Sequence, residues 1–344
     1  MTDKPLVSIG VPTCNRASML ERALKSLVSQ DYPNLEIVIS DNASTDDTPS
    51  ICAQFQEQYP FILYHRNPVM VPAFKNFEKV LLLASGYYFM WASDDDLWES
   101  NFVSTLVDYM EKNDSLVLVA AEAQYMLHNG TKLPFFREGV PFYNPLSHSR
   151  LRRFLLICGA NYGNLIYRLY RREALLTQGG GTVLDVCKFI NEIPIFIQVA
   201  ARGSIQVCDK VLFYKTTSLP TYLQAAREYG FTPTLDQQHL IEASKRPTLM
   251  RDPLPNRGRF GRLRKLLRPA KGLLQWCRYS SSVSLYHART LADIRRAIWR
   301  IDTSFAIKFV LLIAFTARLT AHLLKLVIIW QVQDVIRNRV RVRH

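Results

Sequence analysis

The sequence has few cysteines and no arrangement of them that is typical of a zinc module or a disulfide framework. Its six cysteines in 344 residues are widely spaced, with no Cys-x-x-Cys pair and no histidine at the spacing of a metal ligand. Zinc modules and small secreted folds need closely spaced cysteines. Both classes are therefore excluded, and we expect buried free thiols in a reducing compartment.

Long apolar runs are missing as well. The first residues, MTDKPLVSIG, lead directly into a strand pattern without the basic and apolar regions of a signal peptide. Within 291–335, near the C-terminus, the longest uncharged run, 309–317, is far shorter than the about 20 residues that span a bilayer. We therefore expect the first part of the chain to stay in the cytoplasm and the last part not to cross a membrane.

Acidic residues are scarce in the last quarter only. Residues 1–256 hold 24 Lys and Arg against 26 Asp and Glu, whereas residues 257–344 hold 19 against 3. The first part thus carries −2 and the tail +16, which predicts that the tail meets an anionic surface. We predict a main domain over 1–220, a connecting segment over 221–256 and a basic helical region over 257–344.

The basic region looks helical over 291–335 and amphipathic. Its polar side chains fall on one arc, with apolar side chains turned elsewhere, as in a helix that lies in a membrane interface. That arc consists of Ser304, Lys308, Arg318, His322 and Lys325. Arg337, Arg339, Arg341 and Arg343 would add attraction to anionic lipid.

Two alternatives for this region stay open. The helices could pack against the main domain or in a homo-oligomer, and the arginines could be solvated. Nucleic acid is disfavoured as a partner, because the aromatic residues are not interleaved with the basic ones as a stacking surface requires.

Strands and helices alternate through the first 120 residues. Short apolar runs that read as strands occur at 6–11, 35–40, 61–64, 87–91 and 116–121, and amphipathic helices at 17–30, from about 46, and at 74–83. This alternation predicts right-handed βαβ units, hence an α/β fold with a mainly parallel sheet and helices on both faces.

Regularity weakens in the next hundred residues. We read 128–149 as loop and hairpin, 163–170 as a strand, 171–176 as a short helix and 179–181 as a glycine break. A helix then opens at Asn191-Glu192 and ends at Gly203, followed by two short strands at 204–207 and 211–214.

The predicted sheet brings four polar loops to one edge. In a parallel sheet the loops that follow the strands share the carboxyl edge, where open α/β sheets bind ligands. The loops that meet there are 13–16, 41–45, 66–67 and 94–96.

Three consecutive aspartates, Asp94, Asp95 and Asp96, occupy the last of these loops. Like charges so close repel one another unless a cation neutralises them, and hard oxygen ligands suit Mg²⁺ or Mn²⁺. The alternative is a helix start, with Asp96 and Glu99 as a capping box for a helix over about 97–113.

Four strings resemble the family 2 glycosyltransferases of the GT-A fold: PTCNR at 12–16, QDYPNLEIVISDNASTDDT at 30–48, SDDD at 93–96 and NEIPIFIQVAARG at 191–203. The resemblance covers roughly residues 5–217. It implies a nucleotide-sugar donor, a divalent metal (Mn²⁺ or Mg²⁺) bridging the diphosphate, inversion at the anomeric carbon, and a glycan or lipid-linked acceptor in cell-surface polysaccharide synthesis.

The resemblance also implies roles for individual residues. Asp41 would accept hydrogen bonds from the donor base, although an Asx turn would equally explain it. The family's Asp-x-Asp pattern gives Asp94 to the ribose, Asp95 to the vicinity of the sugar, and Asp96 with Asp94 to the metal. The donor-binding set is Pro12, Thr13, Asn15, Arg16, Asp41, Asn42, Asn76, Asp94 and Asp95.

Glu192 takes the place of the family's catalytic base, eleven residues before Gly203. It would remove the proton of the acceptor hydroxyl. Its alternative role is an acidic residue at a helix N-terminus.

The sequence departs from the family pattern at three places. Asn191-Glu192 replaces Glu-Asp, Pro72-Ala73 stands where relatives often have glycine, and Lys215 stands where many have a histidine ligand. These departures leave two rivals to a glycosyltransferase on the inner face of the plasma membrane. One is a sugar nucleotidyltransferase, and the other is a catalytically silent binding protein docked on membranes.

Overall fold

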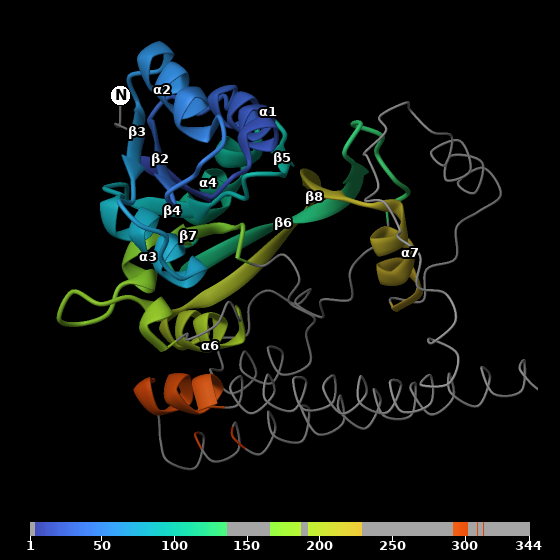
Figure 1. The fold of residues 1–344 in the computed structure, drawn as a ribbon. Coiled ribbons are helices and arrows are strands. Elements are labelled where there is room, and N and C mark those ends of the chain that lie inside the picture. The colour runs from blue at the N-terminus through green and yellow to red at the C-terminus, as the bar shows by residue number, and fades with distance from the viewer. Residues whose placement is uncertain are drawn as a thin grey trace, which may run out of the picture.

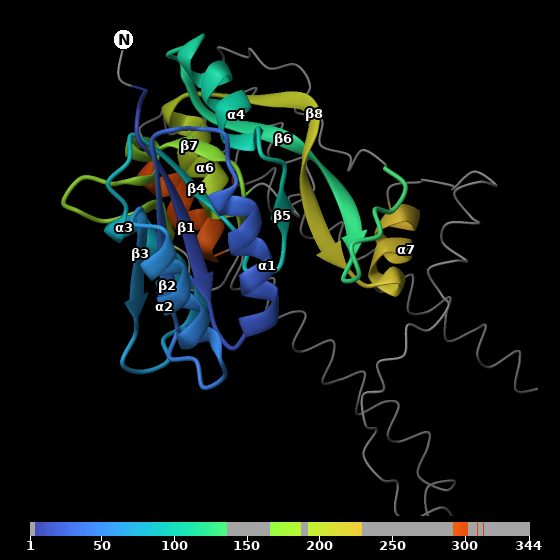
Figure 2. The ribbon, with the colours of Figure 1, turned by 90° about the horizontal axis from the view of Figure 1, so that it is seen from above.

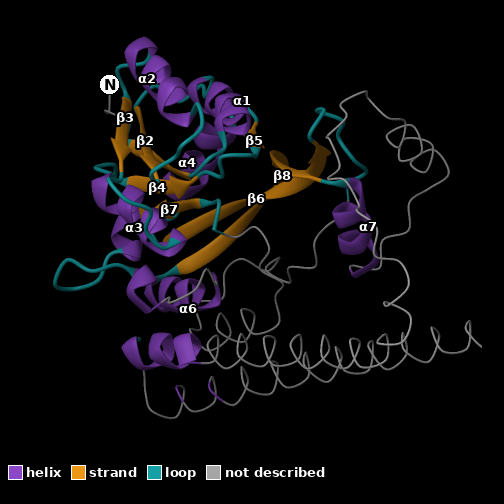
Figure 3. Ribbon diagram, viewed as in Figure 1, coloured by secondary structure: helices purple, strands orange, loops and turns teal. Residues whose placement is uncertain are grey.

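The computed structural model describes residues 4–135, 166–186, 192–228 and 292–301, together with Lys308 and Leu312. These residues form one eight-stranded sheet in the order β3-β2-β1-β4-β7-β6-β8-β5, with helices on both faces (Figures 1 and 3). The strands are β1 Val7–Thr13, β2 Leu35–Asp41, β3 Ile62–Arg66, β4 Tyr88–Trp91, β5 Leu97–Trp98, β6 Leu116–Leu127, β7 Leu169–Arg171 and β8 Ser204–Thr217.

The N-terminal half of the sheet is parallel, as the alternation of strands and helices predicts. β3, β2, β1 and β4 run in one direction, and β6 pairs with β8 in parallel. β7 is antiparallel to both β4 and β6, and β5 is antiparallel to β8. The fold is thus α/β with a mixed, mainly parallel sheet.

The helices cover the two faces of the sheet unequally. α1 (Ala17–Val28), α2 (Thr48–Gln58) and α4 (Phe102–Glu111) lie on one face, and α3 (Ala73–Leu83) and α6 (Glu192–Arg202) on the other (Figures 1 and 2). Alternate residues of β4 enter the two cores, with Phe89 and Trp91 in the core that includes α3 and Tyr88 and Met90 in the core that includes α1 and α4. Because both faces are buried, the strands read as continuous apolar runs.

The second half differs from the sequence prediction in detail. The predicted strands at 204–207 and 211–214 are one strand, β8, whose register against β6 shifts beside Cys208 and Val211. β8 and β6 extend beyond the rest of the sheet, and α7 (Leu219–Glu228) packs near their far end (Figure 1). Of the predicted strand at 163–170, only Leu169 and Tyr170 are in a strand, β7 (Leu169–Arg171); 166–168 form a turn and bend, and 163–165 lie outside the described residues. The short helices η1 (Arg172–Leu175) and η2 (Val183–Val186) follow β7.

The capping-box interpretation of Asp96 is wrong. Residues Leu97–Trp98 form strand β5, which pairs with β8, and α4 begins only at Phe102. The reason is tertiary: Trp98 is buried against Phe213, and this contact draws the segment into the sheet. The three aspartates therefore form a loop between two strands.

One piece of the predicted basic region belongs to the folded body. Residues 292–300 form a helix whose Ile294, Ala297 and Ile298 are buried in the same core as α6, together with Ile301. The described residues contain no helix long and apolar enough to cross a membrane. Apart from Lys308, the polar arc predicted at 304–325 lies outside the described residues, as do the four terminal arginines.

Candidate functional site

The loops after β1, β2 and β4 meet at the carboxyl edge of the sheet and enclose a pocket of about 220 Å³. Six of the predicted site residues line it: Pro12, Thr13, Arg16, Asn42, Asn76 and Asp94. The structure adds Cys14, Ala73, Phe77, Ser93 and Tyr167, which the sequence analysis did not select. The predicted convergence of the loops is therefore confirmed.

The β1 loop is fastened to the β2 loop by both backbone and side chains. The Asn42 N–H donates to the Thr13 carbonyl over 2.9 Å, and Oδ1 of Asn15 accepts the Thr45 N–H over 2.7 Å. Asn15 has a φ of +54°, a conformation that asparagine tolerates better than most residues. Asn15 thus links the β1 loop to the β2 loop. It is not one of the described residues that line the pocket.

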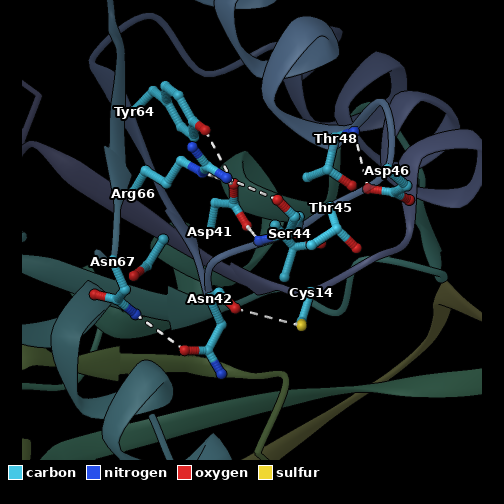
Figure 4. Close-up of polar contacts among 12 residues, drawn as sticks. Cys14, Asp41, Asn42, Ser44, Thr45, Asp46, Thr48, Tyr64, Arg66 and Asn67 are labelled. Atoms are coloured by element: carbon cyan, nitrogen blue, oxygen red, sulfur yellow. Dashed lines mark hydrogen bonds and ion pairs between the residues drawn. The ribbon is translucent and has the colours of Figure 1, made fainter. Parts of the chain in front are cut away.

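Asp41 is fully buried behind the pocket and is already hydrogen-bonded (Figure 4). Its Oδ1 accepts the Ser44 N–H over 2.9 Å, and its Oδ2 accepts the Tyr64 hydroxyl over 3.0 Å and lies 3.4 Å from Arg66 Nε. The bond to Ser44 holds the local turn from three residues away, one residue further than in the Asx turn foreseen as the alternative. Direct contact with a nucleotide base remains a prediction, and it would require this cluster to open.

Three buried asparagines, Asn42, Asn67 and Asn76, form the floor of the site. Asn42 makes two bonds of 2.8 Å with the Val71 backbone. Asn67 donates to Oδ1 of Asn42 over 3.2 Å (Figure 4) and to Oδ1 of Asn76 over 3.0 Å. Asn76, from α3, also accepts the Ser40 hydroxyl over 2.7 Å and donates to the Ser40 carbonyl over 2.9 Å. Asn76 therefore joins α3 to β2 as well as lining the pocket.

Each aspartate of the triplet has a different partner. Oδ2 of Asp94 accepts the Thr13 hydroxyl over 2.8 Å, which joins the β4 loop to the end of β1. Asp95 accepts the Ser93 hydroxyl and lies 3.9 Å from Nη1 of Arg16. Oδ1 of Asp96 accepts the Thr216 N–H over 2.8 Å, at the end of β8.

The surroundings of Asp94 and Asp96 disfavour the ionised form of each carboxyl. Burial raises the pKa of Asp94 to about 6, and the hydrogen bond from Thr13 opposes part of that rise. Burial and the nearby charge of Asp95 raise the pKa of Asp96 to about 7, which the Thr216 N–H and the Lys215 charge counteract. A cation placed beside both carboxyls would relieve these costs.

The donor set suits a magnesium or manganese ion that shares its shell with a ligand. Among the described residues, Thr13 bonds to Oδ2 of Asp94 and Thr216 to Oδ1 of Asp96, so a cation beside both carboxylates would be bound through the second oxygen of each. Within the described part of the chain, no three His, Cys, Asp or Glu side chains form a complete metal site. Mg²⁺ is commonly held by one or two carboxylates plus substrate phosphates, so an incomplete protein shell fits it.

Two basic residues lie beside the triplet, and the sequence analysis named only one of them. Lys215 was noted as a departure from the family pattern, and its Nζ lies 5.7 Å from the ring centre of Tyr125. Arg22, on α1, contacts the triplet and β8 but was not selected. On the polar face of an amphipathic helix, an arginine cannot be distinguished from a solvated charge by sequence alone.

Glu192 is the first residue of α6, but its side chain lies outside the described residues, as does Asn191. A larger cavity of about 780 Å³ lies elsewhere and contains none of the predicted site residues. It is bounded by the 177–181 loop, by Gln198 and Arg202 of α6, and by Arg300 and Ile301.

Residues 8–177 match the family model described as Glycosyl transferase family 2. Over 198 residues the chain is 25% identical to an uncharacterized glycosyltransferase of Haemophilus influenzae, a match that covers 56% of this chain and 61% of the relative. It is 36% identical over 116 residues to the abequosyltransferase RfbV of Salmonella typhimurium, covering 33% of this chain and 35% of the relative.

A third relative is the GalNAc(5)-diNAcBac-PP-undecaprenol beta-1,3-glucosyltransferase of Campylobacter jejuni, 38% identical over 104 residues, or 30% of this chain and 34% of the relative. The matches thus span between 34% and 61% of the length of these relatives. Among solved structures, TarS 1-349 of S. aureus in complex with UDP-GlcNAc has a TM-score of 0.57 at 16% identity, over 91% of this chain and 72% of that chain. This likeness concerns the fold.

Proposed function

Because residues 8–177 belong to the Glycosyl transferase family 2, we propose that this protein is an inverting glycosyltransferase of the GT-A fold. It transfers a sugar from a nucleotide-sugar donor to a glycan or lipid-linked acceptor in bacterial cell-surface polysaccharide synthesis. The observation that carries the proposal is the contact between Thr13 and Asp94 at the pocket rim, next to the buried Asp96. It joins the predicted nucleotide loop to the predicted metal loop.

In this proposal the nucleotide lies in the pocket between the β1 and β4 loops. Thr13, Arg16 and Asn42 line it, and Arg16 extends its positive charge toward the phosphates. Asp94 and Asp96 would hold the Mn²⁺ or Mg²⁺ ion, with Asp95 near the sugar. When bound, the ion supplies charge neutralisation for the departing nucleoside diphosphate.

Glu192 is the proposed base, which takes the proton of the acceptor hydroxyl while that oxygen attacks the sugar from the face opposite the leaving group. Its position at the start of α6 supports this role, because the helix dipole there favours the ionised carboxylate that a base requires. A Glu192→Gln variant should bind donor normally and lose turnover.

Peripheral association with the inner face of the plasma membrane is also part of the proposal. It is supported by the net charge of +16 over 257–344, and the name of the Campylobacter jejuni relative includes PP-undecaprenol. Truncation before residue 292 is a poor test, because Ile294 and Ile298 fill the core. Changing Arg337, Arg339, Arg341 and Arg343 to glutamine should instead reduce pelleting with anionic vesicles, and equal pelleting would contradict the proposal.

The decisive experiment is a calorimetric titration of UDP, GDP and dTDP, with and without Mn²⁺. The wild type is compared with Asp94→Asn/Asp96→Asn and with Asp31→Asn, which removes one exposed aspartate. We expect one nucleotide to bind in a metal-dependent manner to the wild type and to the Asp31 control only.

The rivals give different outcomes. Release of a nucleoside diphosphate from the matching nucleotide sugar and an acceptor supports transfer. Release of pyrophosphate from the matching nucleoside triphosphate and a sugar 1-phosphate supports a nucleotidyltransferase. Nucleotide binding without any turnover supports a silent binding protein. Failure of all three nucleotides to bind overturns the proposed site.

A further inference from the structure

Arg22 is a half-buried residue of α1 that contacts three segments distant from it in the chain. Its Nη2 donates to the Asp95 carbonyl over 3.3 Å and to the Thr216 hydroxyl over 3.1 Å. Its Nη1 donates to the His128 carbonyl over 2.6 Å. One guanidinium thus joins the acidic triplet, the end of β8 and the turn that follows β6.

These contacts form a closed arrangement with Asp96. Thr216 donates its backbone N–H to Oδ1 of Asp96 and accepts a bond from Arg22 through its side chain. Arg22 in turn holds the residue that precedes Asp96, through the carbonyl of Asp95. The position of Asp96 is therefore fixed from both sides, by β8 and by α1.

The chemistry of these contacts leaves the carboxylates free for a cation. The bonds from Arg22 go to two carbonyls and one hydroxyl. A guanidinium has a rigid fork of donors that can serve several fixed acceptors at once, which the single ammonium of lysine cannot reproduce. The three adjacent negative charges of this loop repel one another. Contacts with other segments of the protein are therefore needed to keep the loop in one conformation.

We propose that Arg22 is a positioning residue that fixes the acidic loop against β8, so that Asp94 and Asp96 are held in place to bind a divalent cation together with a nucleoside diphosphate. This inference rests on the proposed function. It assigns to α1 a part in ligand binding that the family comparison does not give to this residue.

The alternative is that Arg22 acts only through its charge. The two hypotheses predict opposite changes in the Mn²⁺ affinity of the Arg22→Met variant. If Arg22 mattered only as a nearby cation, its removal would strengthen binding of Mn²⁺ by reducing repulsion, and Arg22→Lys would change nothing. If Arg22 positions the loop, both Arg22→Met and Arg22→Lys weaken binding, because lysine keeps the charge but loses the fork.

The experiment measures Mn²⁺ affinity by electron paramagnetic resonance of the free ion, with and without the nucleoside diphosphate that the wild type binds. The proteins are the full-length wild type, Arg22→Met, Arg22→Lys and a matched control, Lys25→Met. Lys25 lies on the same helix and pairs only with Glu21 among the described residues, at 2.7 Å on the exposed surface. Thermal unfolding of each protein is recorded in parallel.

We expect Mn²⁺ affinity in the presence of nucleotide to fall about 10- to 100-fold in Arg22→Met, the range for residues that orient metal ligands. Arg22→Lys should show a smaller loss, and Lys25→Met none. Unchanged affinity in both Arg22 variants, stronger binding in Arg22→Met, or a failure of both to fold overturns the inference. Absence of Mn²⁺ and nucleotide binding in the wild type overturns the proposed function itself, together with this inference.

Discussion

The backbone N–H of Thr216 donates to the side chain of Asp96 over 2.8 Å, and so joins two residues that are 120 positions apart in the chain. Asp96 is 3% exposed, so this bond lies in the interior rather than at the rim of the site. The acidic loop is thereby tied to the sheet at both ends, through Thr13 on β1 and through Thr216 on β8.

Removing the Thr13 hydroxyl should weaken the site in a pH-dependent way. The bond from Thr13 lowers the pKa of Asp94, so Thr13→Val should raise that pKa further above about 6. We expect Mn²⁺-dependent nucleotide affinity to fall about tenfold at pH 6.5, the loss of one hydrogen bond to a charged group, and less at pH 8.5. Thr13→Ser keeps a donor and should resemble the wild type at both pH values. Equal losses in the two variants would contradict this explanation.

Protonation of Asp96 should make the metal-free protein more stable at low pH. Its pKa is raised in the folded state from 3.8 to about 7, so between these values the folded protein binds the proton more strongly than the unfolded chain. The stabilising effect is complete below pH 4 and is lost as pH rises through 7. At pH 7.5 the ionised form costs at most about 4 kcal/mol, because each pKa unit corresponds to about 1.4 kcal/mol.

Asp96→Asn removes this titration and tests it. In urea unfolding without metal, we expect the variant to be more stable than the wild type at pH 7.5, with the difference shrinking toward pH 4.5. Added Mn²⁺ should stabilise the wild type at pH 7.5 but not the variant. A variant less stable than the wild type at pH 7.5 would show that the folded protein does not disfavour the ionised carboxylate of Asp96.

Asn76 should matter for stability as well as for ligand binding. It is 3% exposed and bonds to Ser40, Asn67 and the Thr13 carbonyl. Asn76→Ala leaves several buried groups unpaired, so we expect a loss of roughly 2 to 4 kcal/mol in the free energy of unfolding. Asn129→Ala, at an exposed turn, is the matched control and should change stability by less than about 1 kcal/mol. A small effect at Asn76 would mean that its network is dispensable.

The helix over 292–300 should behave as part of the folded body. Ile298 is 1% exposed within the core that includes α6. Ile298→Ala should cost about 2 to 4 kcal/mol of unfolding free energy, whereas Arg295→Ala, on the exposed side of the same helix, should cost under about 1 kcal/mol. Similar effects of the two variants would indicate a detachable tail.

The α/β class and the edge at which the site forms could be predicted from the sequence. Continuous apolar strands separated by amphipathic helices permit few arrangements other than a mainly parallel sheet, and such a sheet gathers the loops after its strands. The pattern predicts that the loops holding Thr13, Asn42 and Asp94 meet, the family resemblance assigns roles to these three residues, and they line one pocket. Local pattern was sufficient here because each loop directly follows a strand.

The rest depended on contacts between distant segments. The pairing of Asp96 and Glu99 satisfies the local rule for a helix start, yet burial of Trp98 against Phe213 draws that segment into a strand. Asp41, Asn67 and Asn76 owe their environments to neighbours on other elements.

Sequence by itself determined which residue types stand at the ends of the strands, because strand and helix periods are local properties of the chain. Tertiary structure alone decided what each polar side chain contacts, since hydrogen-bond partners such as Arg22 and Thr216 lie 194 residues apart. It also decided that a basic segment near the C-terminus completes the core beside α6, because its apolar side chains find a matching surface only in the folded chain.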